Sequence, residues 1–241
     1  MITDEASIRQ VFDSAAAFVP GGTWAACKLD FSIYKDQGYN YAFLMYFPLI
    51  EMITMENFDE EKQYSLMNRS MEQRSRLKKV LLKEAAEHDV KLHVPSVHID
   101  HISPPYMISL SAKEIAVKAG IGWIGKNDLI ISREYGTRIC TIGGVFYADS
   151  FRVDEPVTES KCGSCDLCVK ACPFHNITGK EWGRGITRDD LVDYHRCSVI
   201  RFAGIKKIGH KISCARCVSA CPVCVENVEK VIGSCDESER W

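Results

Sequence analysis

Most of the twelve cysteines in this 241-residue chain lie in its last third, and their spacing limits the possible folds more than any other feature. The first run, CGSCDLCVKACP, has the pattern C-x2-C-x2-C-x3-C followed by proline. Its cysteines are Cys162, Cys165, Cys168 and Cys172. Three thiolates at this pitch wrap one face of a cubane iron–sulfur cluster, whereas the fourth faces the other way and binds a second cluster. Zinc usually takes two well-separated pairs of ligands, so the run predicts iron–sulfur ligation.

A second run, CARCVSACP, is one cysteine short of a full repeat. Because proteins with two clusters share ligands between their runs, each run is expected to complete the other's cluster. The predicted ligands of the first cluster are Cys162, Cys165, Cys168 and Cys221. The predicted ligands of the second cluster are Cys172, Cys214, Cys217 and one further residue.

Spacing alone leaves the fourth ligand of the second cluster open. Cys197, in DYHRCSVI between the two runs, is the preferred residue. Cys224 and Cys235 are its rivals, and a three-iron cluster without a fourth thiolate is a further alternative. Cys27 and Cys140 stand apart from the runs and are expected to be small buried residues.

Composition and charge narrow the functional class. The formal net charge of −2 gives no reason to expect a strongly basic nucleic-acid surface. The opening residues MITDEASIRQ carry acids where a signal peptide needs basic residues. The longest apolar run, YAFLMYFPLI at 41–50, is too short to span a bilayer. We therefore expect a cytoplasmic protein with no membrane partner, in which clustered cysteines bind metal rather than form disulfides.

The polar stretch DEPVTES predicts a domain boundary at 157/158, which separates an α/β domain (1–157) from a two-cluster domain (158–241). Hydrophobic periodicity predicts helices over 4–18, 59–89 and 111–119 and strands over 39–47, 127–132 and 138–148. The predicted fold class is α+β: an α/β domain followed by a domain like a bacterial ferredoxin.

The segment AGIGWIGKN (119–127) has the glycine spacing of a dinucleotide-binding turn, at Gly120, Gly122 and Gly125. That turn requires a strand before the glycines and a helix after them, whereas here a helix precedes and a strand follows. Gly120 is expected to end the preceding helix in the left-handed conformation, with Lys118 in the last turn. From the residues alone, the match to the dinucleotide motif is interpreted as accidental.

Taken with the cysteine runs, the stretches AVKAGIGWIGKNDLII, DYHRC and IGHKISCARCVSACP resemble the epoxyqueuosine reductases and, more distantly, the reductive dehalogenases. The resemblance extends from about residue 95 to 225. It implies two [4Fe–4S] clusters, cobalamin, and an N-terminal α/β sandwich related to nitroreductase and cobalamin-processing folds. It also implies that Cys197 is the fourth ligand of the second cluster.

In that family the glycine segment belongs to the corrinoid side of the molecule. The resemblance therefore implies corrinoid contacts for Gly120, Gly122, Gly125, Lys126 and Asn127, with a turn role for Asn127 as the alternative.

Three departures from the family pattern concern the substrate. The family's C-terminal helical repeat, which helps to hold tRNA, is expected to be missing here. The segment between Cys172 and Cys197 is longer and includes GKEWGRG. Counting back from Trp123, the family's proton-donor aspartate falls at about Tyr106, and the nearest aspartate, Asp100, lies too early. Tyr106 is thus the candidate catalytic proton donor, with a packing role as the alternative.

These features predict an iron–sulfur oxidoreductase that passes low-potential electrons through two clusters to a corrinoid. The expected partners are an electron donor such as ferredoxin or flavodoxin and a small-molecule or corrinoid-protein substrate. One alternative is a corrinoid-free, ferredoxin-like electron carrier for a partner enzyme. The other is epoxyqueuosine reduction on tRNA, ranked last because of the near-neutral charge.

Overall fold

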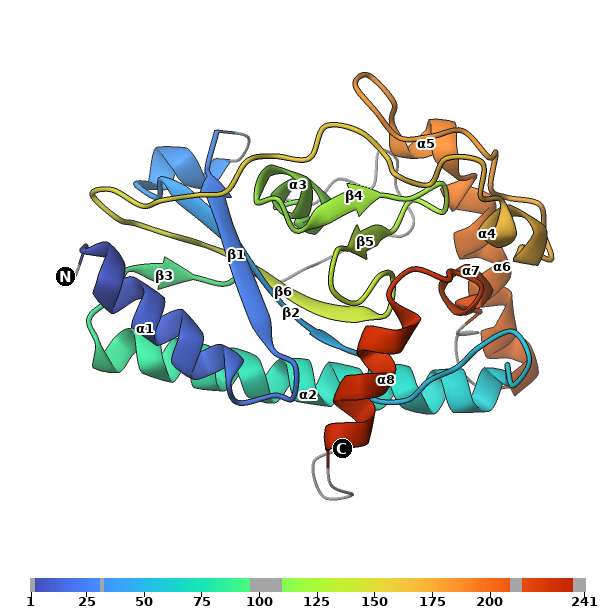
Figure 1. Ribbon diagram of the computed structural model, residues 1–241, viewed down its shortest axis with the longest axis horizontal. Coiled ribbons are helices and arrows are strands. Elements are labelled where there is room, and N and C mark those ends of the chain that lie inside the picture. The colour runs from blue at the N-terminus through green and yellow to red at the C-terminus, as the bar shows by residue number, and fades with distance from the viewer. Residues whose placement is uncertain (1–2, 31–32, 96–109, 209–213, 236–241) are drawn as a thin grey trace. The chain divides into compact units, whose positions relative to one another are not determined.

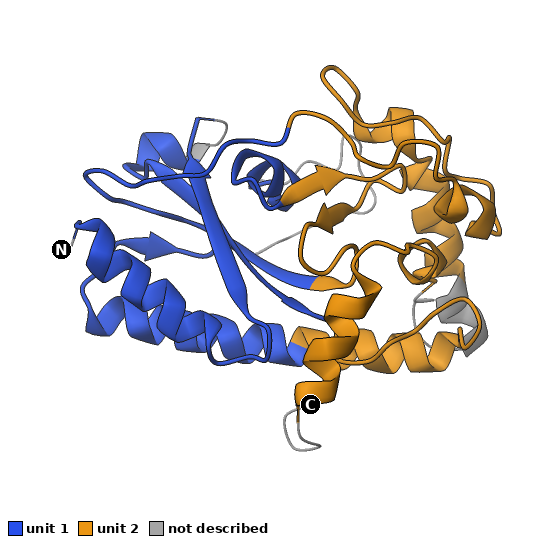
Figure 2. Cartoon of the chain, viewed as in Figure 1, with its two compact units in different colours: residues 1–48, 72–121, 140–157 blue, residues 49–71, 122–139, 158–241 orange. Residues whose placement is uncertain are grey.

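The computed structural model describes residues 3–30, 33–95, 110–208 and 214–235 (Figure 1). The chain divides into two compact units, coloured separately in Figure 2. Unit 1 consists of Met1–Pro48, Glu72–Ile121 and Cys140–Val157. Unit 2 consists of Leu49–Met71, Gly122–Ile139 and Thr158–Trp241. The last segment of unit 1 ends at Val157, where the sequence predicts the domain boundary. Segments 49–71 and 122–139, which precede this position, belong to the same unit as the cysteine runs.

Unit 1 is built on a four-stranded sheet with the order β1-β2-β6-β3. Its strands are β1 (Thr23–Lys28), β2 (Tyr41–Pro48), β6 (Ile139–Phe146) and β3 (Leu92–His93). β1 and β2 pair antiparallel, with Thr23 opposite Tyr46 and Lys28 opposite Tyr41. Every residue of β2 is buried, as its uninterrupted apolar run YAFLMYFP indicates for a strand covered on both faces.

Three helices cover the sheet of unit 1. α1 (Glu5–Ala16) and the later part of α2 (Glu60–Glu87) bury their apolar residues with one face of β2 and β6, in a core that includes Phe12, Phe43 and Phe146. α3 (Ala112–Lys118) packs on β1 and β2. A short 3-10 helix, η1 (Ile33–Gln37), lies between β1 and β2.

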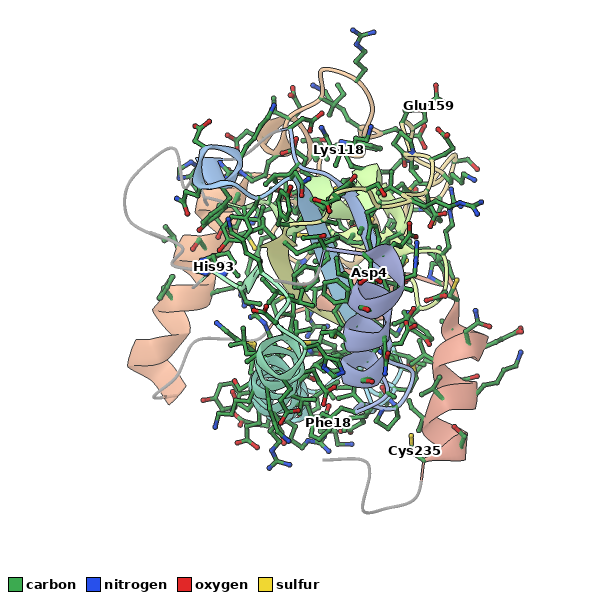
Figure 3. The ribbon with its side chains drawn as sticks, turned by 90° about the vertical axis from the view of Figure 1, so that its left-hand side faces the viewer. Asp4, Phe18, His93, Lys118, Glu159 and Cys235 are labelled. Atoms are coloured by element: carbon green, nitrogen blue, oxygen red, sulfur yellow. The ribbon has the colours of Figure 1, made fainter. Side chains whose placement is uncertain are left out.

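Side-chain caps explain where two of these helices begin. The Asp4 carboxylate accepts a hydrogen bond from the Ser7 N–H at 2.9 Å, which satisfies a free donor at the start of α1. Figure 3 labels Asp4 and Phe18 near the two ends of this helix. The Ser111 hydroxyl accepts a hydrogen bond from the Glu114 N–H at 3.3 Å at the start of α3.

The helices and strands predicted from the sequence are confirmed to within a few residues where the structure describes them.

Unit 2 contains a small antiparallel hairpin and several short helices. The hairpin consists of β4 (Gly122–Ile124) and β5 (Ile130–Ser132). The helices are α4 (Leu167–Ala171), α5 (Arg188–Leu191), α6 (Tyr194–Ile208), α7 (Arg216–Ser219) and α8 (Val225–Ser234). The first turns of α2, residues 60–71, also belong to this unit. In the described part of the chain, no helix is both long and apolar enough to cross a membrane.

Candidate metal centre

The first cysteine run forms a turn that leads into α4. The Cys165 N–H donates a hydrogen bond to the Cys162 carbonyl at 3.1 Å. Gly163 holds this turn at a φ of +54°, a conformation that glycine adopts without steric cost. Cys168 lies within α4, and Cys172 ends the helix at its C-cap.

The second run is arranged in a similar way around α7. Cys217 lies in the helix, and the buried Cys221 follows it. α4 and α7 pack against each other within unit 2, so the two runs lie side by side.

One set of thiol groups surrounds Cys168. The pKa of Cys168 is raised to about 11, first by burial and then by neighbouring thiol groups. Those neighbours are Cys162, Cys221 and Cys165. Cys221, from the second run, thus lies near Cys168 and Cys162 of the first run.

A second set of thiol groups surrounds Cys217. Burial is the main cause that raises the pKa of Cys217 to about 12, and neighbouring thiol groups add to it. Those neighbours are Cys214, Cys168, Cys197 and Cys172. Cys197, carried by α6 outside both runs, therefore lies near Cys217, and Cys168 of the first set also lies near Cys217.

The two rivals of Cys197 have other partners. The Cys224 thiol donates to the Arg133 carbonyl at 3.1 Å. The Cys235 thiol, labelled at the end of α8 in Figure 3, donates to the Val231 carbonyl at 3.1 Å.

Several buried polar atoms near the cysteines have no hydrogen-bond partner among the described residues and could donate to an anionic cluster. Arg138 Nε, Ser198 Oγ and Ser219 Oγ are buried without a hydrogen-bond partner among the described residues. Ser198 adjoins Cys197, and Ser219 lies between Cys217 and Cys221. Buried donors of this kind are costly unless an acceptor satisfies them, and the sulfurs of a thiolate-bound cluster are acceptors. The residues present therefore fit a cluster. No three described Cys, His, Asp or Glu side chains form a group that could hold a single metal ion.

Segment 122–139 holds the cysteine runs in place, and it includes Lys126 and Asn127, for which the family resemblance implies corrinoid contacts. Lys126 Nζ donates to the carbonyls of Gly163 at 2.7 Å and Cys165 at 3.0 Å. Asn127 Nδ2 donates to the Cys217 carbonyl at 3.2 Å. Both side chains are buried, so their donors are engaged within unit 2.

Two further residues of this segment, Thr137 and Arg138, contact the second run and have no signature in the sequence. The Thr137 hydroxyl donates to the Val218 carbonyl at 3.2 Å and also lies near the Cys221 thiol, whose pKa it lowers against the larger effect of burial. Arg138 donates to the Cys221 carbonyl at 2.7 Å. Nothing in the surrounding sequence YGTRIC marks these residues, because their partners lie about 80 residues away along the chain.

The three glycines of AGIGWIGKN serve different parts of the fold. Gly120 ends α3 with a φ of +71°, as expected, and a β4 strand follows, which is the reverse of the dinucleotide motif. A Cβ on Gly122 would lie 1.9 Å from the Ile131 carbonyl oxygen, so glycine permits the close approach of β4 and β5. A Cβ on Gly125 would lie 2.6 Å from Asn127 Oδ1. Tyr106 and Asp100 lie outside the described residues.

Comparison with known families identifies the first cysteine run. The family model described as "4Fe-4S binding domain" matches residues 155–178, which contain Cys162 to Cys172. This match supports an iron–sulfur site, in place of zinc, in the first run.

Relatives of known name cover only parts of the chain. The epoxyqueuosine reductase of Listeria monocytogenes is 44% identical over 71 residues, which are 30% of this chain and 18% of that protein. The epoxyqueuosine reductase of Vibrio cholerae is 31% identical over 120 residues, which are 46% of this chain and 30% of that protein. These matches therefore cover less than a third of either relative.

Solved structures extend the likeness of the fold. A crystal structure of an epoxyqueuosine reductase has a TM-score of 0.54 at 17% identity and covers 90% of this chain and 65% of its own. A catabolic reductive dehalogenase in complex with 3-bromo-4-hydroxybenzoic acid has a TM-score of 0.58 at 15% identity, with coverages of 90% and 33%. At these identities the structures establish the shared mixed α/β fold.

Proposed function

Because the chain is a relative of the epoxyqueuosine reductases and contains a 4Fe–4S binding domain, we propose that it is a reductase with two [4Fe–4S] clusters that passes low-potential electrons to a corrinoid. When bound, such clusters supply single electrons at potentials set by charge, hydrogen bonds and solvent exposure. The observation that carries the proposal is the grouping of the thiols into two neighbouring sets.

The first set provides four thiolates for one cluster. In this proposal the ligands are Cys162, Cys165, Cys168 and Cys221. Cys165 is exposed and Cys221 is buried, so a cluster held by these residues would be closer to water at Cys165 than at Cys221. The ferredoxin-like sharing of ligands between runs supports the assignment.

The second set provides the thiolates for the other cluster. In this proposal the ligands are Cys172, Cys197, Cys214 and Cys217. The Asn176 N–H donates to the Cys172 sulfur at 3.4 Å, a contact that stabilises a thiolate. Cys168 lies close to Cys217, which supports electron transfer between neighbouring clusters.

The corrinoid enters the proposal through the resemblance. A bound corrinoid would supply reductive chemistry at its cobalt ion. The described residues assign no side chain to it, because Lys126 and Asn127 bind the backbone of the cysteine runs. Tyr106 remains the proposed proton donor for the substrate, and the proposed electron source is a ferredoxin or flavodoxin.

The proposal is tested by anaerobic EPR of the iron-reconstituted protein with added cob(II)alamin. We expect iron–sulfur signals on reduction and a cobalt spectrum that differs from that of cob(II)alamin in buffer. An unchanged cobalt spectrum beside intact cluster signals would contradict the corrinoid step and favour the corrinoid-free electron carrier. Absence of any iron–sulfur signal would contradict the reductase itself.

Epoxyqueuosine reduction on tRNA is the second candidate, and the names of the relatives favour it. One solved epoxyqueuosine reductase with this fold is in complex with a modified tRNA stem loop. The test is reduction of an epoxyqueuosine-containing stem loop by the reduced, corrinoid-supplemented protein. Conversion to queuosine would support this candidate. If the protein binds the corrinoid but does not reduce the stem loop, the reductase acts on a different substrate.

A further inference from the structure

Two buried cations lie on segment 122–139 of unit 2. The Lys126 residue is 7% exposed and the Arg138 residue is 3% exposed. Neither forms an ion pair with a carboxylate among the described residues. Burial lowers the pKa of Arg138, and the nearby Cys221 and Glu229 act in the opposite direction. A charge removed from water is costly unless an opposite charge offsets it.

Lys126 binds the first cysteine run. Its ammonium group donates to the carbonyl oxygens of Gly163 and Cys165, at 2.7 and 3.0 Å. Because a trans peptide group is planar, fixing these carbonyls also fixes the direction of the N–H groups of the residues that follow. Lys126 thus brings a positive charge to the loop that holds Cys162 and Cys165 and sets the orientation of two of its peptide groups.

Arg138 binds the second run at the point where it joins the same thiol set. Its guanidinium donates to the Cys221 carbonyl at 2.7 Å and to the Ser219 carbonyl at 2.9 Å, and its Nε has no partner among the described residues. Cys221 is the member of this run that neighbours Cys162 and Cys168. Both cations are therefore attached to ligands of the proposed first cluster.

The backbone around the second thiol set is held differently. The Asn127 amide, which is neutral, donates to the Cys217 carbonyl. The nearest arginines along the chain are more exposed: Arg196 is exposed, and Arg216 is half-buried with its guanidinium 4.2 Å from the centre of the Phe58 ring. Water screens exposed charges more than buried ones.

We infer that Lys126 and Arg138 raise the reduction potential of the cluster held by Cys162, Cys165, Cys168 and Cys221, so that it accepts an electron before the second cluster. The inference rests on the proposed function. A cluster with four thiolate ligands is an anion, and one-electron reduction adds a further negative charge, so a nearby buried cation stabilises the reduced form more than the oxidised form. The same anion explains why two cations are buried although, in the described part of the chain, neither has a carboxylate within ion-pair distance.

The test is an anaerobic redox titration with dithionite, followed by EPR, on the reconstituted full chain. Lys126→Gln and Arg138→Gln remove the charge and keep N–H donors for the carbonyls. Each is expected to lower the ratio of reduced to oxidised first cluster by about tenfold at a fixed potential, which is about 59 mV for one electron. The second cluster is expected to change less.

Lys170→Gln is the matched control. Lys170 lies in α4 between Cys168 and Cys172 and its side chain is 70% exposed, so the same loss of charge is screened by water. We expect both midpoint potentials to remain unchanged. Unmoved potentials in Lys126→Gln and Arg138→Gln would overturn the inference, as would an equal shift in Lys170→Gln.

The wild-type protein provides a second measurement that does not depend on the folding of these variants. The Cys197→Ser variant identifies which EPR signal belongs to the second cluster. The inference requires that the other signal appear at the higher potential, and the reverse order would overturn it. A wild-type protein that assembles no [4Fe–4S] cluster would instead overturn the proposed function.

Discussion

Cys197 is the residue on which the assignment of the second cluster depends. It lies on α6, outside both cysteine runs, and its thiol lies near that of Cys217. Cys224 is closer to the second run along the chain, yet its thiol donates to a backbone carbonyl. Spacing alone leaves Cys197, Cys224 and Cys235 as candidates for the fourth ligand of the second cluster. The positions of their thiols in the structure favour Cys197.

Replacing Cys197 by serine is expected to alter the iron content and EPR signal of one cluster and to leave the other cluster intact. Serine is a weaker ligand for iron than a thiolate, so the second cluster should be lost or converted to a three-iron form. Cys224→Ser is the control and should retain both signals. Intact signals in Cys197→Ser together with a lost cluster in Cys224→Ser would reassign the ligand.

Sequence spacing indicates which cysteines are candidate cluster ligands, but it does not indicate which residues surround them. Ligand spacing is local, so the patterns in the two runs are enough to indicate cluster binding. The roles of Lys126 and Arg138 could not be predicted in this way. Each binds backbone carbonyls of a distant segment, and a carbonyl acceptor leaves no signature in the residue type.

Strand β6 contacts α3 on one face of the unit 1 sheet and the aromatic core on the other face. Its adjacent glycines, Gly143 and Gly144, point to opposite faces of the sheet. A Cβ on Gly143 would lie 3.5 Å from Ile115 of α3 and from Leu44, which is ordinary contact. A Cβ on Gly144 would lie 2.4 Å from the Phe43 ring in the aromatic core. The two positions form a matched pair within one strand.

Gly144→Ala is expected to lower the free energy of unfolding by about 1–3 kcal/mol, because the added methyl group overpacks the core against Phe43. Gly143→Ala should leave it unchanged or raise it slightly, since the methyl group meets no clash and restricts the unfolded chain. Chemical denaturation followed by far-UV circular dichroism measures both. Equal effects of the two substitutions would contradict this packing.

Periodicity predicts the long helices and strands, whereas tertiary contacts determine how the segments group into the two units. The helix expected over 59–89 is α2, at Glu60–Glu87, and the apolar strand over 39–47 is β2, at Tyr41–Pro48. The hairpin β4–β5, in contrast, belongs to the cysteine unit. Gly136 illustrates the reason. A Cβ added to Gly136 would lie 2.2 Å from the Val223 carbonyl oxygen, so the two backbones pack closely. This contact joins residues far apart along the chain, and a local pattern does not encode it.

The two units differ in what stabilises them. The large cluster of buried apolar side chains, which includes Phe12, Phe43 and Phe146, lies within unit 1. Unit 2 has short helices and a two-stranded hairpin, and many of its buried residues are polar, including Lys126 and Arg138. Under the proposed function, the bound clusters contribute much of the stability of unit 2.

Removal of the iron by an anaerobic chelator is therefore expected to loosen unit 2 and to spare unit 1. Hydrogen–deuterium exchange should rise in α4, α7 and β5, whereas β2 should keep its protection. The cluster-loaded protein at the same pH is the control. Equal loss of protection in β2 would show that the clusters stabilise the whole chain as one cooperative unit.

The binding of two [4Fe–4S] clusters is tested most directly by measuring iron and acid-labile sulfide in the anaerobically reconstituted protein, combined with Mössbauer spectroscopy. Two [4Fe–4S] clusters predict about eight iron atoms and about eight sulfides per chain, with all iron in cubane clusters. About four iron atoms, or zinc without labile sulfide, would contradict the two-cluster assignment on which the proposed electron transfer depends.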